Sequence, residues 1–374
     1  MNIHPPAEIG MDAGDVDTPA LLVDLDAFEH NVSLMASKVA EFGVTHRPHA
    51  KTHKSPDVAR RQIAVGAVGQ CCQKVGEAEA LVAGGIQDVL VSNQIVGARK
   101  LDRLAALAKV VRIGVCVDDA RNIGDLSSAA QRFGAEIEVL VEIDIGAERC
   151  GVMPGTAAVE LAKMVDGAAG LKFGGLQAYQ GAAQHIRGFG ERRTAIEKAG
   201  EQVKDTVRKL EAAGLECRLV TGAGTGTFQF EAGSGVWNEL QAGSYCFMDA
   251  DYGLNLDEDG KYVDTFHQSL FVLATVMSHP TKDRAVLDAG HKATSIDSGL
   301  PKITGIEGVT YSRASDEHGT LVLGVNAPSL KLGDKLRLVP GHCDPTVNLH
   351  DWYVCVRGGV VEALWPVAAR GAAF

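Results

Sequence analysis

The chain contains 374 residues with a formal net charge of −11 at neutral pH, and this acidic balance disfavours nucleic acid and anionic membrane surfaces as partners. Its content of 46% hydrophobic and 22% charged residues is typical of soluble globular proteins. No apolar run is long enough to span a membrane, and residues 1–10 lack the apolar stretch of a targeting segment. The 8 cysteines are scattered without a CxxC pair, which is typical of reduced thiols, so we expect a cytoplasmic protein.

The first predicted helix and strand lead into a basic segment. Residues 26–42 have helical spacing, and residues 44–51 have the composition of a short strand that ends at Lys51. Neighbouring cations at Arg47 and Lys54, together with partial burial, would favour a neutral amine on Lys51, which can form a Schiff base with a carbonyl group. The alternative is a basic turn that binds an acidic neighbour or faces water.

Short apolar runs alternate with longer amphipathic stretches between residues 44 and 243. This alternation predicts a (β/α)₈ barrel of the TIM type in an α/β fold. The alternative is a doubly wound open sheet, but no GxGxxG motif follows the first strand. The predicted strands cover residues 44–50, 68–72, 88–92, 110–117, 137–143, 173–178, 218–221 and 239–242.

The sequence after residue 265 contains short strand-like runs without long helical patterns. These runs predict a small β domain. Residues 18–24 are also strand-like and can pair with that domain. We therefore predict a barrel domain over 20–262 and a β domain over 263–374 that includes residues 1–19. The strand-like runs cover residues 269–277, 284–288, 335–339, 353–357 and 360–365.

Polar residues stand where the predicted barrel strands end, which is where barrel enzymes carry their catalytic groups. Lys51, Gln73 and Tyr179 occupy three of these ends. The glycines and threonines of the loop Thr221–Thr227 can bind a phosphate, and Gly243–Ser244 can complete the site. Glycines that only form turns are the alternative. A phosphate site that faces a lysine predicts pyridoxal phosphate as the cofactor.

Two further side chains are candidates for contact with the cofactor ring. Arg149 can approach the pyridine nitrogen, although an ordinary salt bridge is the alternative. His185 or Tyr179 can pack on a face of the ring.

His342 and Asp344 form a candidate metal pair. Two positions apart, they would face the same side of an extended strand. An imidazole and a carboxylate together suit Mg²⁺, Mn²⁺ or Zn²⁺ and leave positions for substrate. A hydrogen-bonded His–Asp pair in a turn is the alternative.

Taken together, the motifs resemble the fold-type III pyridoxal phosphate enzymes, which form the alanine-racemase-like barrel group. Within this group the chain resembles the branch of D-threonine aldolase and 3-hydroxy-D-aspartate aldolase, with D-serine dehydratase as a more distant relative. The resemblance implies a barrel followed by a β domain, and a homodimer with active sites near the interface. The motifs that carry it are residues 47–51, 71–75, 146–151, 177–181, 240–252 and 340–351.

The resemblance also implies residue roles. Lys51 would carry the cofactor, and His342 and Asp344 would bind a divalent metal, with Mg²⁺ or Mn²⁺ favoured over Zn²⁺ because Asp344 is a hard oxygen ligand. Ala223 departs slightly from the Gly-Gly-Gly-Thr-Gly form of this branch, but it keeps its backbone N–H group. Cofactor contacts are implied for Gln73, Tyr179, Thr225, Gly243, Ser244 and Tyr252.

The expected reaction is retro-aldol cleavage of D-threonine or D-3-hydroxyaspartate to glycine and acetaldehyde or glyoxylate. The metal would lower the pKa of the β-hydroxyl group, and His185 or a metal-bound water would remove its proton. One alternative is β-dehydration to a keto acid, for which the related family carries a softer His-x-Cys site. Another is a non-catalytic pyridoxal phosphate carrier, which resembles a lone barrel.

Overall fold

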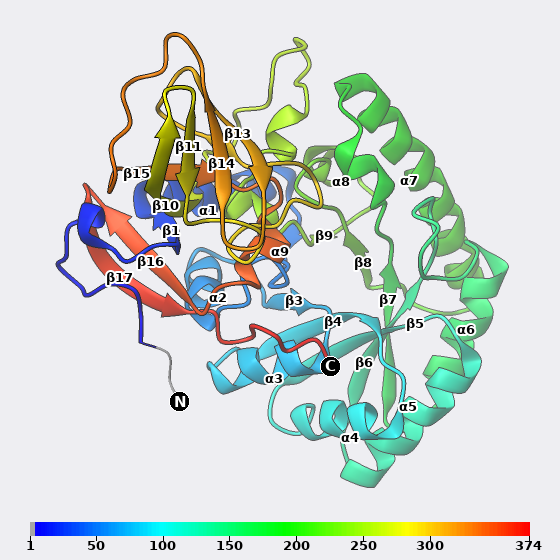
Figure 1. Ribbon diagram of the computed structural model, residues 1–374. Helices are drawn as coiled ribbons and strands as arrows, with labels where there is room; N and C mark the ends of the chain where they lie inside the picture. The colour runs from blue at the N-terminus through cyan, green and yellow to red at the C-terminus, as the bar shows by residue number, and fades with distance from the viewer. Residues whose placement is uncertain (1–3) are drawn as a thin grey trace.

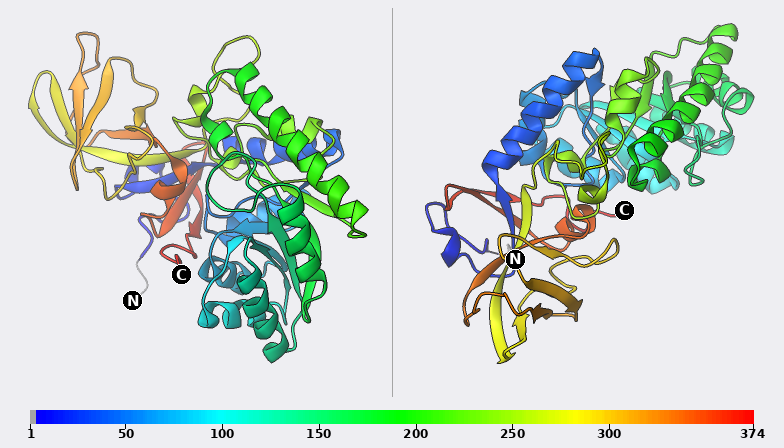
Figure 2. Two further views of the ribbon diagram at one scale, coloured as in Figure 1. Left: turned by 90° about the vertical axis from the view of Figure 1, so that its right-hand side faces the viewer. Right: turned by 90° about the horizontal axis from the view of Figure 1, so that it is seen from above.

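The computed structural model describes residues 4–374, so residues 1–3 of the predicted N-terminal segment lie outside the described residues. It contains two β-sheets, an eight-stranded one and a nine-stranded one. Figure 2 shows the two parts side by side from two directions, and Figure 1 shows the helices outside the eight-stranded sheet. The predicted fold class, a (β/α)₈ barrel followed by a β domain, is confirmed.

The eight-stranded sheet is a closed ring of parallel strands. Its order is β2-β9-β8-β7-β6-β5-β4-β3, and a parallel bridge between His49 and Cys71 joins the two ends. Across this junction the Ala50 N–H group donates to the Cys71 carbonyl at 2.7 Å. The strands are β2 (Thr45–His46), β3 (Gln70–Cys72), β4 (Asp88–Gln94), β5 (Arg112–Val117), β6 (Ile137–Glu142), β7 (Leu171–Gln177), β8 (Leu219–Gly222) and β9 (Glu239–Leu240).

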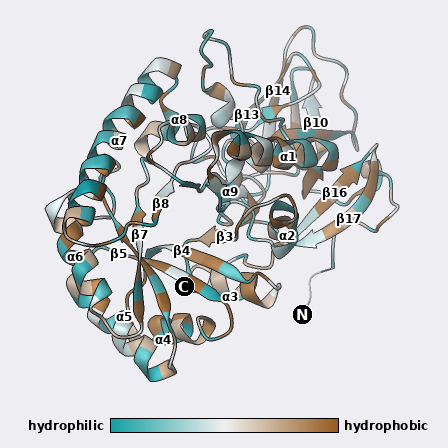
Figure 3. Cartoon of the chain, turned by 180° about the vertical axis from the view of Figure 1, so that it is seen from behind, coloured by the Kyte–Doolittle hydropathy of each residue, from teal (hydrophilic) through white to brown (hydrophobic). Residues whose placement is uncertain are grey.

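Helices cover the outside of this ring. The first begins where the Asp24 carboxylate accepts a hydrogen bond from the Ala27 N–H group at 3.1 Å, and it ends at Gly43, whose φ of 69° favours glycine. Figure 3 shows the barrel strands β5 to β7 mainly in the hydrophobic colour and α7 mainly in the hydrophilic one. Within residues 4–374, no helix has the length and apolar content to cross a membrane. The helices are α1 (Leu25–Phe42), α2 (Pro56–Ala64), α3 (Val75–Ala83), α4 (Ala98–Leu107), α5 (Ala120–Phe133), α6 (Thr156–Asp166), α7 (Phe189–Ala212) and α8 (Phe228–Gly233).

Side chains of the barrel strands alternate between two apolar layers. Leu90, Cys116 and Leu140 form a cluster with Cys71 that is separate from the main core, whereas neighbours such as Val115 belong to the large core beneath the helices. The separate cluster fills the inside of the ring. The barrel is therefore packed, and the loops at the strand ends remain to form a site.

The second sheet is built mostly from the C-terminal part of the chain. Six of its strands match the predicted runs, β1 among them, but β12, β13, β14 and the short helix α9 were not predicted. Figure 1 shows α9 between the two sheets. The elements are β1 (Ala20–Asp24), β10 (Leu270–Thr281), β11 (Arg284–Leu287), β12 (Lys302–Ile303), β13 (Val309–Ala314), β14 (Gly319–Leu323), β15 (Lys335–Val339), α9 (Cys343–Val347), β16 (Trp352–Arg357) and β17 (Val360–Pro366).

Strand β1 lies in the middle of this second sheet. It pairs antiparallel with β10 and parallel with β16, so that Leu21 faces both Val272 and Tyr353. The Tyr353 hydroxyl also donates to the His53 carbonyl at 2.6 Å, which joins the sheet to the barrel. We therefore propose to place β1 with the β domain and to begin the barrel domain at α1, instead of at residue 20.

His53 makes the fold sensitive to acid. Its Nδ1 atom accepts from the Ser55 N–H group at 3.1 Å, and its Nε2 atom lies 3.3 Å from Gln70 Oε1, so the neutral ring uses both nitrogens. A proton on Nδ1 would remove the acceptor for Ser55. Burial lowers the pKa of His53 from 6.5 to about 4.

We expect the free energy of unfolding to decrease as the pH falls from 6.5 to 4. The unfolded chain binds this proton near pH 6.5 and the folded chain only near pH 4, so unfolding takes up a proton between these pH values. This proton uptake lowers the free energy of unfolding by up to about 3 kcal/mol. Thermal unfolding between pH 7.5 and 4.5 measures the effect. His53→Gln should flatten this slope because the amide does not titrate, and an unchanged slope in that variant would contradict the assignment.

Candidate active site

A cavity of about 270 Å³ lies where the barrel strands end. It brings together eight residues predicted to contact the cofactor, but not His185, although the eight come from segments far apart in the sequence. Five further polar residues line it that the sequence did not single out as site residues: His49, Thr52, Ser92, Gln177 and Gln241. The predicted lining residues are Lys51, Gln73, Arg149, Tyr179, Thr225, Gly243, Ser244 and Tyr252.

Lys51 lies in the turn after β2 with its side chain 42% exposed, and its amine forms an ion pair with Asp344. Removal from bulk water lowers the pKa of Lys51, but the charge of Asp344, its hydrogen bond to the amine and the nearby Tyr179 together outweigh this effect, so the pKa lies above its usual value. The expectation of a neutral amine is therefore wrong for the structure in which Lys51 is paired with Asp344. It failed because the sequence does not reveal a carboxylate that comes from the other end of the chain.

The basic neighbours of Lys51 in sequence do not surround its amine. The Arg47 guanidinium lies 3.1 Å from the Glu239 carboxylate, and the Lys54 amine pairs with Glu77. Both cations are therefore neutralised by carboxylates of the barrel and α3. Their charges cannot lower the pKa of Lys51 in the way that the sequence suggests.

His49 is the basic neighbour that lines the cavity. Its Nδ1 atom accepts from the Lys51 N–H group at 3.3 Å, and its Nε2 atom lies 3.1 Å from Ser92 Oγ and 2.8 Å from the Gln73 amide nitrogen. Burial lowers the pKa of His49 well below its usual value, and the charge of Lys51 lowers it further. The ring is therefore neutral, and it holds the turn that carries Lys51 against the ends of β3 and β4.

The Gly-rich loop after β8 and the segment after β9 approach each other with small residues and an unpartnered hydroxyl group. The hydroxyl of Thr225 is buried and has no hydrogen-bond partner within residues 4–374. It is one of six buried side-chain polar atoms in the described part of the chain for which this holds. A Cβ atom on Gly243 would lie 2.6 Å from the His49 carbonyl oxygen, so this close approach requires glycine. Ala223 adopts a φ of 71°, a left-handed conformation that is unusual for a residue with a side chain.

Aromatic side chains form another wall of the cavity. The Arg149 guanidinium lies 5.6 Å from the centre of the Tyr179 ring. Tyr252 is buried, and its ring lies 5.4 Å from that of His185. His185 itself does not line the cavity, and its Nδ1 atom lies 2.6 Å from the Asp251 carboxylate.

The predicted metal pair lies beside Lys51 but not on an extended strand. His342 is extended, whereas Asp344 lies in the first turn of α9, so the expectation of a strand is wrong. His342 Nδ1 lies 2.7 Å from an Asp297 carboxylate oxygen, which leaves Nε2 to face a ligand. Among the described residues, no group of three or more His, Cys, Asp or Glu side chains is placed to hold a metal ion.

Comparison with known proteins shows related sequences over nearly the whole chain. The model of the alanine racemase N-terminal domain matches residues 23–251, and that of a putative serine dehydratase domain matches residues 269–356. A 3-hydroxy-D-aspartate aldolase from Paracoccus denitrificans (strain Pd 1222) is 52% identical over 99% of this chain and 96% of its own length. A D-threonine aldolase from Arthrobacter sp is 49% identical over 99% and 97%.

A crystal structure of D-threonine aldolase from Filomicrobium marinum superposes with a TM-score of 0.96, at 52% identity and with coverage of 99% of this chain and 100% of that chain. The chain belongs to this aldolase family. The alanine racemase-like barrel of the family implies pyridoxal phosphate as cofactor. The cavity fits that group, because it combines an amine on Lys51, an unpartnered hydroxyl on Thr225 and glycines whose backbones approach closely.

Three lining residues of the aldolase-family cavity were not predicted, although their positions in the sequence mark them as candidates. Ser92 and Gln177 stand at the C-terminal ends of β4 and β7, and Gln241 directly follows β9. The strand-end rule therefore points to all three. Because strand boundaries predicted from sequence are uncertain by a residue or two, it selected Tyr179 and not Gln177 at the end of β7. Asp297 carried no sequence signal for its contact with His342.

Proposed function

We propose that this protein is a carbon–carbon lyase that cleaves a D-3-hydroxy-amino acid to glycine and an aldehyde, with pyridoxal phosphate and a divalent metal. The contact between the Lys51 amine and the Asp344 carboxylate beside the strand-end cavity carries the proposal. In this contact the residue expected to hold the cofactor meets one of the two expected metal ligands. The 52% identity to a 3-hydroxy-D-aspartate aldolase supports the same reaction.

The groups around the cavity suggest how the cofactor would be held. Thr225 and Ser244, with the backbone of the Gly-rich loop, would bind the phosphate. Tyr179 and Arg149 would flank the ring, and Lys51 would hold the cofactor until the substrate amine replaces it.

His342 and Asp344 would hold Mg²⁺ or Mn²⁺, and Zn²⁺ suits this pair less because it has only one imidazole and one hard oxygen ligand. The hydrogen bond from His342 to Asp297 supports this role, because metal-binding histidines usually donate their other N–H group to such an acceptor. When bound, pyridoxal phosphate accepts the electron pair of the breaking Cα–Cβ bond, and the metal lowers the pKa of the β-hydroxyl group.

The remaining proton transfers concern Lys51 and His185. Once its amine is free, Lys51 lies beside Asp344 at the edge of the cavity and would return a proton to the Cα atom of the product. His185 was expected as a base, but it is paired with Asp251 outside the cavity lining. We therefore propose no direct contact between His185 and the substrate.

Two further features of the protein are part of the proposal. All eight cysteines are free thiols in the described structure, which supports a cytoplasmic enzyme. We also propose a homodimer, as the family resemblance implies, and sedimentation of the holoenzyme measures this directly.

β-Dehydration is a second candidate reaction, favoured by the match of residues 269–356 to a serine dehydratase domain model. The two reactions are distinguished by their products. We expect the enzyme with pyridoxal phosphate and Mn²⁺ to release glycine from D-threonine and D-3-hydroxyaspartate, together with acetaldehyde or glyoxylate. The L-isomers serve as controls and should not react. Release of a keto acid and ammonia without glycine would overturn the aldolase assignment in favour of dehydration.

A further inference from the structure

Arg192, in the first turn of α7, is a buried cation without an anionic partner. Its side chain is 1% exposed, and no carboxylate within residues 4–374 forms an ion pair with it. Its two terminal nitrogens donate to the backbone carbonyls of Ile186 at 2.8 Å, Arg187 at 2.6 Å and Leu256 at 2.7 Å. Removing a cation from water is costly unless an opposite charge compensates for it.

The third nitrogen of the guanidinium has no partner among the described residues 4–374. Arg192 Nε is buried without a hydrogen-bond acceptor, as is Thr225 Oγ1 in the Gly-rich loop. Burial lowers the pKa of Arg192, and the nearby charge of Arg187 lowers it further. The position therefore favours an additional negative charge in its neighbourhood.

Arg192 and Thr225 line the same small cavity, whose volume is about 40 Å³. Thr225 and Tyr252 line both this small cavity and the larger one that contains Lys51, so the small cavity lies behind the Gly-rich loop. A volume of this size holds a water molecule where polar groups are present to bind it. The Arg192 Nε–H group and the Thr225 hydroxyl are such groups, and Gly226 of the loop also lines this space.

We propose that Arg192 supplies the positive charge for the cofactor phosphate from behind the Gly-rich loop, through a buried water and the Thr225 hydroxyl. In this arrangement Arg192 Nε donates to the water, the water donates to Thr225 Oγ1, and the Thr225 hydroxyl donates to the phosphate. The inference rests on the proposed cofactor and adds a positioning residue to it. It also gives each of the two unpartnered groups a hydrogen bond.

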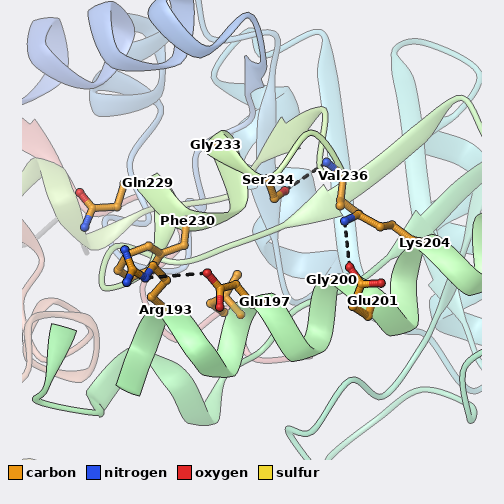
Figure 4. A pocket seen from close by; sticks show the side chains of 11 residues that line it. Arg193, Glu197, Gly200, Glu201, Lys204, Gln229, Phe230, Gly233, Ser234 and Val236 are labelled. Carbon is orange, nitrogen blue, oxygen red and sulfur yellow. Dashed lines mark hydrogen bonds and ion pairs between the residues drawn. The ribbon is translucent and has the colours of Figure 1, made fainter. Parts of the chain in front are cut away.

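The neighbouring arginine provides a matched control. Arg193 is 53% exposed and pairs with Glu197 at 3.8 Å on the outer side of α7. Figure 4 shows it in an outer pocket between α7 and α8, with Phe230, and shows Lys204 paired with Glu201 in the same pocket. The charges drawn there are compensated, and that pocket does not share Thr225 with the Lys51 cavity. Replacing Arg193 thus removes an arginine from the same helix without changing the loop.

The test compares pyridoxal phosphate with pyridoxal, which lacks the phosphate. Dissociation constants are measured by absorbance titration of the full-length apoprotein for Arg192→Gln, Arg192→Lys and Arg193→Gln. We expect Arg192→Gln to weaken pyridoxal phosphate binding about 10- to 100-fold, as expected for the loss of a charge-assisted interaction, and to change pyridoxal binding less than about 3-fold. Arg192→Lys keeps the charge and should stay within about 5-fold of the wild type for both ligands. Arg193→Gln should change neither.

A double variant tests the hydrogen-bonded route through Thr225. If Arg192 acts through this hydroxyl, Arg192→Gln should weaken pyridoxal phosphate binding much less in a Thr225→Val background than in the wild type. Fully additive losses would overturn the route, and equal losses for both ligands would show a purely structural role for Arg192. If Arg192→Gln does not fold, Arg192→Lys decides, since a loss above 10-fold that is confined to pyridoxal phosphate contradicts a charge-based role. A wild-type protein that binds neither ligand would instead refute the proposed cofactor.

Discussion

Replacing Lys51 with alanine is expected to remove both the visible absorbance of the bound cofactor and the turnover. The amine of Lys51 is the one amine among the predicted site residues, and it reaches the cavity between His49 and the Gly-rich loop. Without it, the carbonyl of the cofactor has no lysine to attach to, and the proton that Lys51 can return to the product is lost. Loss of covalent catalysis together with a general acid corresponds to a decrease in kcat of at least about 10³-fold.

Absorbance spectra of the reconstituted protein and glycine release from D-threonine measure the two effects separately. Lys100→Ala, an exposed lysine on α4, is the matched control and should retain both signals. An unchanged spectrum in the Lys51→Ala variant would show that another residue carries the cofactor.

Asp344→Asn should separate cofactor binding from the metal-dependent step. Asparagine keeps the size of the side chain but removes the charge that holds the Lys51 amine and the proposed metal. The positive charge of Lys51 and its hydrogen bond hold the pKa of Asp344 below its usual value despite the burial of the carboxylate, so Asp344 is negatively charged at neutral pH. We expect the cofactor absorbance to remain and kcat to decrease about 10²- to 10³-fold, because a bound metal contributes several kcal/mol to charge stabilisation.

The metal requirement provides the second measurement for this variant. Wild-type activity should disappear with excess chelator and return with Mn²⁺, whereas the residual activity of Asp344→Asn should not respond to either treatment. Asp283→Asn, in the turn between β10 and β11, applies the same substitution to an exposed carboxylate away from the cavity. Full wild-type activity in excess chelator would exclude a metal at His342 and Asp344.

The barrel could be predicted from the sequence because its strands are buried on both faces. Such strands are continuous apolar runs, and the amphipathic stretches between them mark the helices. Strand β13 was missed because the polar residues Ser312 and Arg313 interrupt its apolar pattern, and β14 was missed because it has only 5 residues and begins at Gly319. Helix α9 was missed because it has 5 residues and contains Pro345, which is tolerated in a first turn.

Eight of the residues that line the cavity could be predicted from the strand-end rule, the Gly-rich loop and the family resemblance, but the contacts between distant residues could not. The strand-end rule identified Lys51, Gln73 and Tyr179, whose positions follow from the parallel order of the barrel strands. The contact between Lys51 and Asp344 joins residues 293 positions apart, and no periodic pattern encodes it. The protonation state of Lys51 depends on that contact, so it could not be inferred from the basic residues next to it.

The central position of β1 in the second sheet has a consequence for how the chain folds during synthesis. Leu21 leaves the ribosome among the first residues, but its parallel partner Tyr353 follows only near the end of translation. At about 5–20 residues per second, β1 waits on the order of tens of seconds for its neighbours, while the barrel strands can already assemble with one another. During that time its apolar residues, among them Leu22 and Val23, are exposed to other nascent chains. Chaperone binding to ribosome-bound chains should therefore concentrate on residues 20–24 and end when β16 has emerged.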